Sequence, residues 1–257
     1  MENNVNKPVV KTEQNNIYRP KRPKRFVVKP KFSFNFDKRF WWNALNVLVS
    51  GLLGGIAFSV GTTAYLSVNN KSVGSALFTL GMIIIFSYGF GFYTSKIGFA
   101  IKNSTEQNLM LIPIWLGNLL GSLLVGGILS LTRTSISETL YSRANQLCGA
   151  TLSDSVGGIL ILSVLCGFLM FIATDNYKNA KNVAQKYIVL FLISMVFLLC
   201  EFEHFASSAF LFTMAGALNI KAFWYLLLMT LGNSIGALII PLAHSGVKLI
   251  QKKAKQQ

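Results

Sequence analysis

Six apolar stretches dominate the sequence, and each is long enough to cross a lipid bilayer. A helix needs about 20 residues to span the hydrocarbon core. Of the 257 residues, 13% are charged and 52% are hydrophobic, whereas a soluble domain carries about 25% charged residues. We therefore expect an all-α membrane protein with six transmembrane helices in one domain over residues 41–250. The predicted spans cover residues 43–68, 74–101, 107–131, 155–174, 187–218 and 222–247.

The basic residues are distributed unevenly along the chain, which has a formal net charge of +15. Residues 1–40 combine a polar stretch, typical of disorder, with the sequence FVVKPKFSFNFDKRFWW, in which aromatic and basic side chains alternate. This alternation favours an interfacial anchor on anionic lipid over an arm that binds nucleic acid. With this tail inside the cell, 20 of the 24 lysines and arginines lie on the cytoplasmic side. The positive-inside rule then predicts a multi-pass plasma-membrane protein whose basic tails, 1–40 and 251–257, are both cytoplasmic.

The fifth apolar run, residues 187–218, contains the charged sequence EFEH near its middle. A straight helix over this run would be about 48 Å long, more than a bilayer requires. A carboxylate at the bilayer centre costs about 3 kcal/mol on insertion scales. We therefore expect the helix to break near Glu201, Glu203 and His204, at a place where these groups are shielded, paired or functional.

The second run is interrupted in a similar way by the sequence SYGFGFYTSK. Gly89 and Gly91 lower the cost of unwinding a helix, and Thr94 and Lys96 follow them. Irregular backbone at membrane depth is tolerated where it lines a cavity or is buried in protein. The pattern favours a broken helix here, although a helix that simply ends near Tyr93 would produce the same sequence.

The sequence Leu-Gly-Asn-x-x-Gly occurs twice, as LGNLLG in the third run and LGNSIG in the sixth. Each copy follows an interrupted run, and the central residues Asn118 and Asn233 are 115 positions apart. Two halves of three spans each must have opposite orientations, and paired broken helices in inverted repeats are typical of transport proteins. The motif could also be a helix-packing sequence that arose twice, since glycine lets helices approach closely.

These motifs together resemble the formate/nitrite transporter family over the six spans. The family pattern Phe-Glu-His is kept at 202–204, but Glu201 replaces its leading glycine and Ser208 its asparagine. In the second run Thr94 is kept, while Gly91 stands where the family has an acid. The resemblance implies a pentameric assembly of aquaporin-like protomers that conduct small monovalent anions. It implies formate, nitrite or a similar ion as the substrate and membrane lipid as a further partner.

The resemblance also implies the residues of the pore. His204 would lie at its midpoint and face Thr94, and a histidine with an unperturbed pKa of about 6.5 can supply a mobile proton. The anion would then cross as the neutral acid, which avoids the cost of a bare ion in low dielectric. The apolar constrictions would be formed by Phe78, Met82, Phe92, Tyr93, Leu165 and Phe197. The residues expected to hold the helix breaks are Glu203, Asn118, Asn233, Gly89 and Gly91.

Other classes of function fit the sequence less well. An enzyme is disfavoured because EHFAS is not the HExxH metal motif and no nucleophile elbow is present. A metal transporter would have to use Glu201, Glu203 and His204, but residues two apart do not share a helix face. A channel for water, glycerol or hydrosulfide remains the second hypothesis, although the Asn-Pro-Ala pair of aquaporins is absent from the sequence. We expect no cofactor, no bound metal and no nucleic-acid partner.

Overall fold

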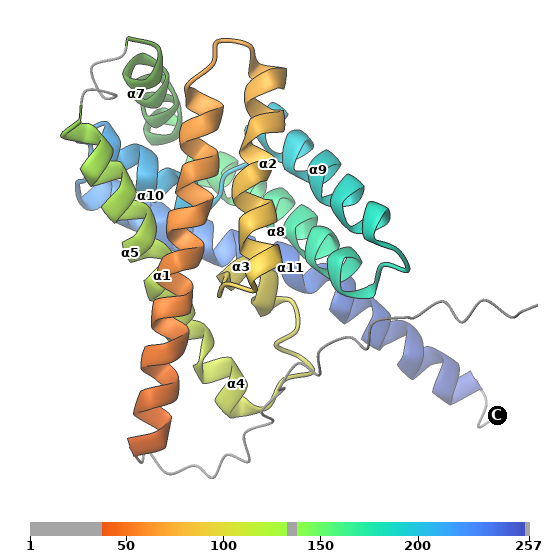
Figure 1. Ribbon diagram of the computed structural model, residues 1–257. Coiled ribbons are helices and arrows are strands. Elements are labelled where there is room, and N and C mark those ends of the chain that lie inside the picture. Colours follow the sequence, from red (N-terminus) through yellow and green to blue (C-terminus); the bar gives the residue numbers. More distant parts are fainter. Residues whose placement is uncertain (1–37, 133–137, 255–257) are drawn as a thin grey trace, which may run out of the picture. The chain divides into compact units, whose positions relative to one another are not determined.

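The computed structural model describes residues 38–132 and 138–254, and every regular element within these residues is a helix (Figure 1). The chain divides into a unit of Met1–Ser33 and a unit of Phe34–Gln257, and all described residues belong to the second. Most of the predicted basic tail, residues 1–37, and the end of the predicted C-terminal tail, residues 255–257, lie outside the described part.

Ten helices follow one another along the described chain. The first five are α1 (Lys38–Leu66), α2 (Lys71–Tyr88), α3 (Tyr93–Ile97), α4 (Thr105–Leu109) and α5 (Leu111–Ser130). The other five are α7 (Glu138–Ser153), α8 (Val156–Asn179), α9 (Val183–Leu199), α10 (Phe205–Met214) and α11 (Ile220–Ala254). Five helical segments are long and apolar enough to cross a membrane, and they contain α1, α2, α5, α8 and α11. The protein is therefore a multi-pass membrane protein.

Two predicted runs are each divided by a non-helical segment, residues 89–92 in the second run and 200–204 in the fifth. The fifth run, 187–218, holds the two shorter apolar helices α9 and α10. The second run, 74–101, holds most of α2 and the short helix α3. In both cases the helix ends where the sequence places glycine or charged residues within the apolar run.

Helix α7 was not predicted, because its polar sequence lies between the third and fourth apolar runs. Arg143 explains how it is held in place: its Nη1 donates hydrogen bonds to the backbone oxygens of Tyr65 and Val68, 2.8 Å away in the case of Tyr65. The guanidinium also lies 4.7 Å from the centre of the Tyr65 ring. Since the last carbonyls of a helix have no partner within the helix, Arg143 satisfies the end of α1.

Polar side chains define where several helices begin. Asn70 accepts a hydrogen bond from the third residue of α2, and Ser155 and Asn182 do the same for α8 and α9. Ser104 and Gln107 form a reciprocal capping box at α4. Such caps satisfy backbone N–H groups that have no partner inside the helix.

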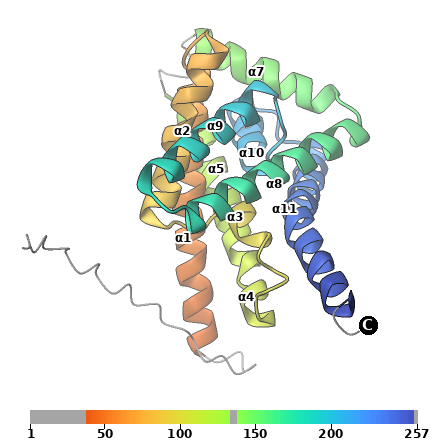
Figure 2. The same ribbon diagram turned by 90° about the vertical axis from the view of Figure 1, so that its right-hand side faces the viewer.

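The two halves pack through equivalent glycines. A Cβ atom on Gly121 of α5 would lie 2.3 Å from the backbone oxygen of Leu52 in α1. A Cβ atom on Gly236 of α11 would lie 1.9 Å from the backbone oxygen of Val164 in α8. Helices come this close only where the side chain is absent, and Figure 2 shows α8 and α11 side by side. The contact between α1 and α5 thus recurs between α8 and α11, more than 100 residues further along.

Candidate functional site

Two short non-helical segments form the framework of the site. One lies between α2 and α3, and the other between α9 and α10. Gly89 and Glu201 have left-handed backbones, with φ of 72° and 52°. Phe92 and His204, the N-caps of α3 and α10, are both extended, with φ of −130° and −126°. The two segments therefore follow the same backbone path, and equivalent residues are 112 positions apart.

Asn118 of α5 ties the first segment to its surroundings and is fully buried. Its Nδ2 donates to the backbone oxygens of Gly51 and Gly91, at 2.7 and 2.8 Å. Its Oδ1 accepts from the backbone N–H of Tyr93, at 2.8 Å. One amide thus links α1, the non-helical segment and the first residue of α3.

Asn233 of α11 makes the equivalent contacts in the second half. Its Nδ2 donates to the backbone oxygens of Ser163 and Glu203, both at 2.9 Å. Its Oδ1 accepts from the backbone N–H of Phe205, at 3.3 Å. Because the leading glycines of both motifs also face the neighbouring helix closely, each Gly-Asn-x-x-Gly copy combines helix packing with support for unwound backbone.

His204 has no solvent exposure and joins the two segments. Its Nε2 lies 3.1 Å from the Thr94 hydroxyl, and its Nδ1 accepts from the backbone N–H of Ala206 at 3.2 Å. A ring nitrogen that accepts carries no proton, so the hydrogen of the neutral ring is on Nε2. Nε2–H therefore donates to Thr94. Within the described residues Thr94 makes no further side-chain hydrogen bond, which leaves its O–H available as a donor.

Phenyl rings surround the imidazole. The ring centres of Phe58, Phe92 and Phe205 lie 4.7, 5.3 and 4.9 Å from that of His204, in stacked arrangements. Phe197 approaches edge-on, at 6.2 Å. Sequence reasoning missed Phe58 because nothing distinguishes it from other apolar residues in the first run.

Four of the residues predicted for the constrictions are buried around this centre, namely Phe78, Met82, Phe92 and Phe197. The Phe78 ring lies 5.0 Å from Phe58 and 5.6 Å from Phe197, centre to centre. Tyr93 is only partly buried, and its hydroxyl lies 2.9 Å from the Ser234 hydroxyl of α11. The aromatic residues thus form one connected cluster with the imidazole.

Leu165 does not join the cluster within this chain, because its side chain is 41% exposed. The buried residues of α8 follow the three- and four-residue spacing of a helix face. They are Ile159, Ser163, Cys166, Gly167, Met170, Phe171, Ala173 and Thr174. Leu165 lies outside that face. The alignment of this residue with a constriction stays a prediction.

Glu203 is one of the residues expected to hold the helix breaks, and its carboxylate contacts side chains of two helices. It accepts hydrogen bonds from two hydroxyls: Thr151 of α7 at 2.7 Å and Ser208 of α10 at 2.9 Å. Its side chain therefore links the second segment to the helix that was not predicted.

A small cavity of about 50 Å³ adjoins Glu203. Phe197 stands between the cavity and the imidazole, because it lines the cavity and also contacts His204. We call it the Glu203 cavity; its polar lining consists of Thr62, Tyr65, Thr151, Glu201, Glu203, Ser207 and Ser208. Glu201 forms an ion pair with Lys71, with 2.8 Å between Nζ and Oε1.

A metal site is not supported by the arrangement of ligands. Over residues 38–132 and 138–254, no group of three or more His, Cys, Asp or Glu side chains is placed to hold an ion. Glu201 and Glu203 point to different partners, Lys71 and Thr151 respectively. His204 is enclosed by aromatic rings, so the three residues considered as ligands do not converge.

Comparisons with known proteins agree with this architecture. The family model for formate/nitrite transporters matches residues 32–245, whereas no curated protein matches the sequence. A solved pentameric formate channel with formate bound is 21% identical, with a TM-score of 0.68, over 80% of this chain and 98% of that one. A second solved structure, an FNT family ion channel, is 19% identical, with a TM-score of 0.66, over 78% and 87%. At these identities the structural matches show a shared fold.

Proposed function

This chain belongs to the formate/nitrite transporter family, and we propose that it is a plasma-membrane channel for small monovalent anions or their weak acids. Formate and nitrite are the first substrates to test. The family consists of transporters, in agreement with the prediction that the protein is not an enzyme. One observation carries the proposal: a hydrogen-bonded His204–Thr94 pair inside a phenyl cage.

We propose six membrane crossings in two inverted halves. In this arrangement α2 with α3, and α9 with α10, each form one interrupted crossing. The repeated asparagine contacts support this assignment, because Asn118 and Asn233 bind equivalent backbone groups in the two halves. Three crossings per half would reverse the direction of the second half, as in other transporters with inverted repeats.

The permeation path in this proposal runs from the Glu203 cavity past Phe197 and Phe78 to the imidazole, and then past Phe92 and Met82. These apolar side chains are almost completely buried, so a bare anion would lose its hydration between them. Because moving an unpaired charge into such surroundings costs far more than moving a neutral molecule, the permeant would cross as the acid.

His204 and Thr94 would act together on the permeant. The Nε2–H group donates to the Thr94 oxygen, and the Thr94 O–H is free to donate to an oxygen of the anion. Such a chain of hydrogen bonds is polarised cooperatively. A proton taken up at Nδ1 from the aqueous side would replace the bond from the Ala206 N–H. Nε2–H would then pass its proton to the Thr94 oxygen while the Thr94 O–H passes its own to the anion, which leaves a neutral imidazole and the neutral acid.

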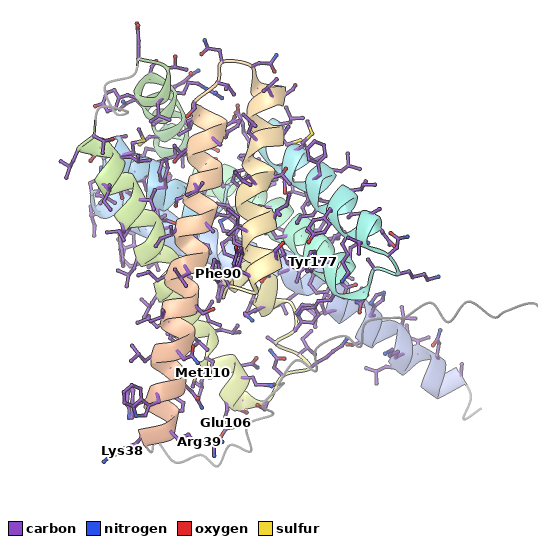
Figure 3. All side chains as sticks on the ribbon, in the orientation of Figure 1. Lys38, Arg39, Phe90, Glu106, Met110 and Tyr177 are labelled. Carbon is purple, nitrogen blue, oxygen red and sulfur yellow. The ribbon has the colours of Figure 1, made fainter. Side chains whose placement is uncertain are left out.

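The proposal includes a homopentamer with both termini in the cytoplasm, in contact with membrane lipids. Lys38 and Arg39 begin α1 at the end far from α7, and Glu106 of α4 lies at the same end (Figure 3). Trp41 and Trp42 follow, with 63% and 69% exposure, as expected for side chains at a membrane interface. The pentamer is suggested by the assembly of the similar formate channel.

Flux into proteoliposomes would test the function directly. Formate, nitrite and hydrosulfide would be compared between about pH 5 and about pH 8, the range in which histidine titrates. We expect at least one to pass faster at low pH, and His204→Ala to change that pH dependence. His244→Ala is the matched control, because His244 is an exposed residue of α11 away from the phenyl cage. Glycerol swelling without anion flux would instead indicate a neutral-solute channel.

A further inference from the structure

An ion pair lies at the rim of the Glu203 cavity. Lys71, the first residue of α2, contacts Glu201 in the segment between α9 and α10. Both side chains are partly exposed, 41% for Lys71 and 57% for Glu201. The pair therefore joins two elements that are far apart in sequence and lies where solvent meets the cavity.

Glu201 occupies a backbone conformation that favours glycine. Its φ of 52° is the only positive value among the described non-glycine residues, and its equivalent in the first half is Gly89. A left-handed conformation is unfavourable for a residue with a side chain, because its Cβ atom lies too close to the following carbonyl oxygen. Strained residues of this kind persist where the surroundings determine them and concentrate at functional positions. The carboxylate at this rim thus calls for a functional explanation.

The cavity presents acceptors to an incoming molecule. The hydroxyl hydrogens of Thr151 and Ser208 are used by Glu203, and that of Ser207 by the backbone oxygen of His204. The Thr62 hydroxyl donates to the backbone oxygen of Phe58. An approaching anion would meet carboxylates and hydroxyl oxygens, and the Tyr65 hydroxyl is the lining hydroxyl whose hydrogen is not used by these contacts.

Positive charge near the cavity is limited. Arg143 is committed to the carbonyls at the end of α1 and to the Tyr65 ring. Lys71 contacts one of the two carboxylates directly, that of Glu201. Coulomb interactions at this rim therefore depend on the balance between Lys71 and Arg143 on one hand and Glu201 and Glu203 on the other.

We propose that Glu201 is a specificity-determining residue, which lowers the access of anions relative to neutral molecules, and that Lys71 offsets its charge. The inference rests on the proposed channel function and on the path through the Glu203 cavity. In this arrangement the pair adjusts anion access at the rim, whereas the His204–Thr94 pair acts at the centre.

The test is a double-mutant cycle on formate flux at about pH 7. Removing one charge at the rim changes the local anion concentration by about two- to fivefold at low ionic strength. Glu201→Gln should raise the initial formate flux by this factor, and Lys71→Gln should lower it. The double variant should return close to the wild-type rate.

Ionic strength separates an electrostatic role from a structural one. At about 1 M salt the Debye length falls to about 3 Å, so the effects of both substitutions should largely disappear. Glycerol or water flux should not change in either variant. Glu201→Asp and Lys71→Arg retain the charges and should retain the wild-type rate. Lys221→Gln removes an exposed lysine from the start of α11, away from the cavity lining, and serves as the matched control.

The outcomes distinguish this inference from the proposed function. If the wild-type protein passes no anion at all, the channel function itself is wrong. If wild-type protein passes formate but both charge-removing variants match it, or their effects persist in high salt, the role of Glu201 is wrong. Should Glu201→Gln fail to assemble, Lys71→Gln alone decides between a salt-sensitive loss of flux and no effect.

Discussion

The two non-helical segments share one backbone geometry but carry different chemistry. Each is supported by an asparagine that bonds three backbone groups, and each ends in an extended N-cap residue. The first segment has Gly89 and Phe92 where the second has Glu201 and His204. The comparison teaches that the backbone framework is repeated, whereas ionisable side chains occur in the second segment alone.

The site requires both segments despite this asymmetry. Thr94 lies two residues after Phe92, and its hydroxyl meets the imidazole of the second segment. The Phe92 ring stacks on the same imidazole, with 4° between the ring planes. The first segment thus supplies a hydroxyl and an apolar surface, and the second supplies the titratable group.

The largest effect is expected from removing the shared support. Asn118→Ala or Asn233→Ala would leave three buried backbone groups without their partner, at about 1–3 kcal/mol for each. We expect both variants to lose several kcal/mol of stability, or to fail to assemble, as measured by thermal unfolding in detergent. The shorter bond to Tyr93 (2.8 Å) than to Phe205 (3.3 Å) predicts the larger loss for Asn118.

Asn108→Ala is the matched control for these two substitutions. Asn108 is half-buried and donates one hydrogen bond, to the backbone oxygen of Ala100 at 3.0 Å, so its loss should cost only about 1 kcal/mol. If replacing either Asn118 or Asn233 by alanine cost as little stability as Asn108→Ala, the two supports would not be equivalent.

An intermediate effect is expected from making the second segment resemble the first. His204→Phe keeps an aromatic ring against Phe58 and Phe92 but removes the hydrogen bond to Thr94. We expect a folded protein whose formate flux falls at least about tenfold, equivalent to about 1.4 kcal/mol, and no longer depends on pH near the histidine range.

Thr94→Ser tests the same contact from the first segment. It retains the hydroxyl and should keep most of the flux, whereas Thr94→Val should not. A His204→Phe variant with undiminished, pH-dependent flux would show that the two segments differ in sequence without differing in function.

The smallest effect concerns the left-handed residues. Gly89→Ala meets no atom within 4 Å and should lose about 1 kcal/mol through its backbone conformation alone. Glu201→Gly should gain a similar amount, reduced by up to about 1 kcal/mol for the exposed ion pair with Lys71. Opposite shifts in the unfolding temperature are expected, and shifts of the same sign would contradict the equivalence of these positions.

Much of the framework could be predicted because its signals are local. Long apolar runs indicate membrane helices, and glycine or charged residues within them coincide with the ends of α2 and α9. The positions of Asn118 and Asn233 were evident from their shared motif. Helix α7 was missed because a polar helix outside the apolar runs has no comparable signal, and its position depends on Arg143 reaching the end of α1.

Pattern and family resemblance singled out His204 and Thr94, but the contact between them joins residues 110 positions apart. The same limit applies to Phe58, which belongs to the cage, to Leu165, which does not, and to the pairing of Glu201 with Lys71. By itself the sequence determined a multi-pass helical protein with two interruptions and a repeated asparagine motif. Only the tertiary structure decided which side chains meet, because apolar residues within a run look alike until packing assigns each one to a face.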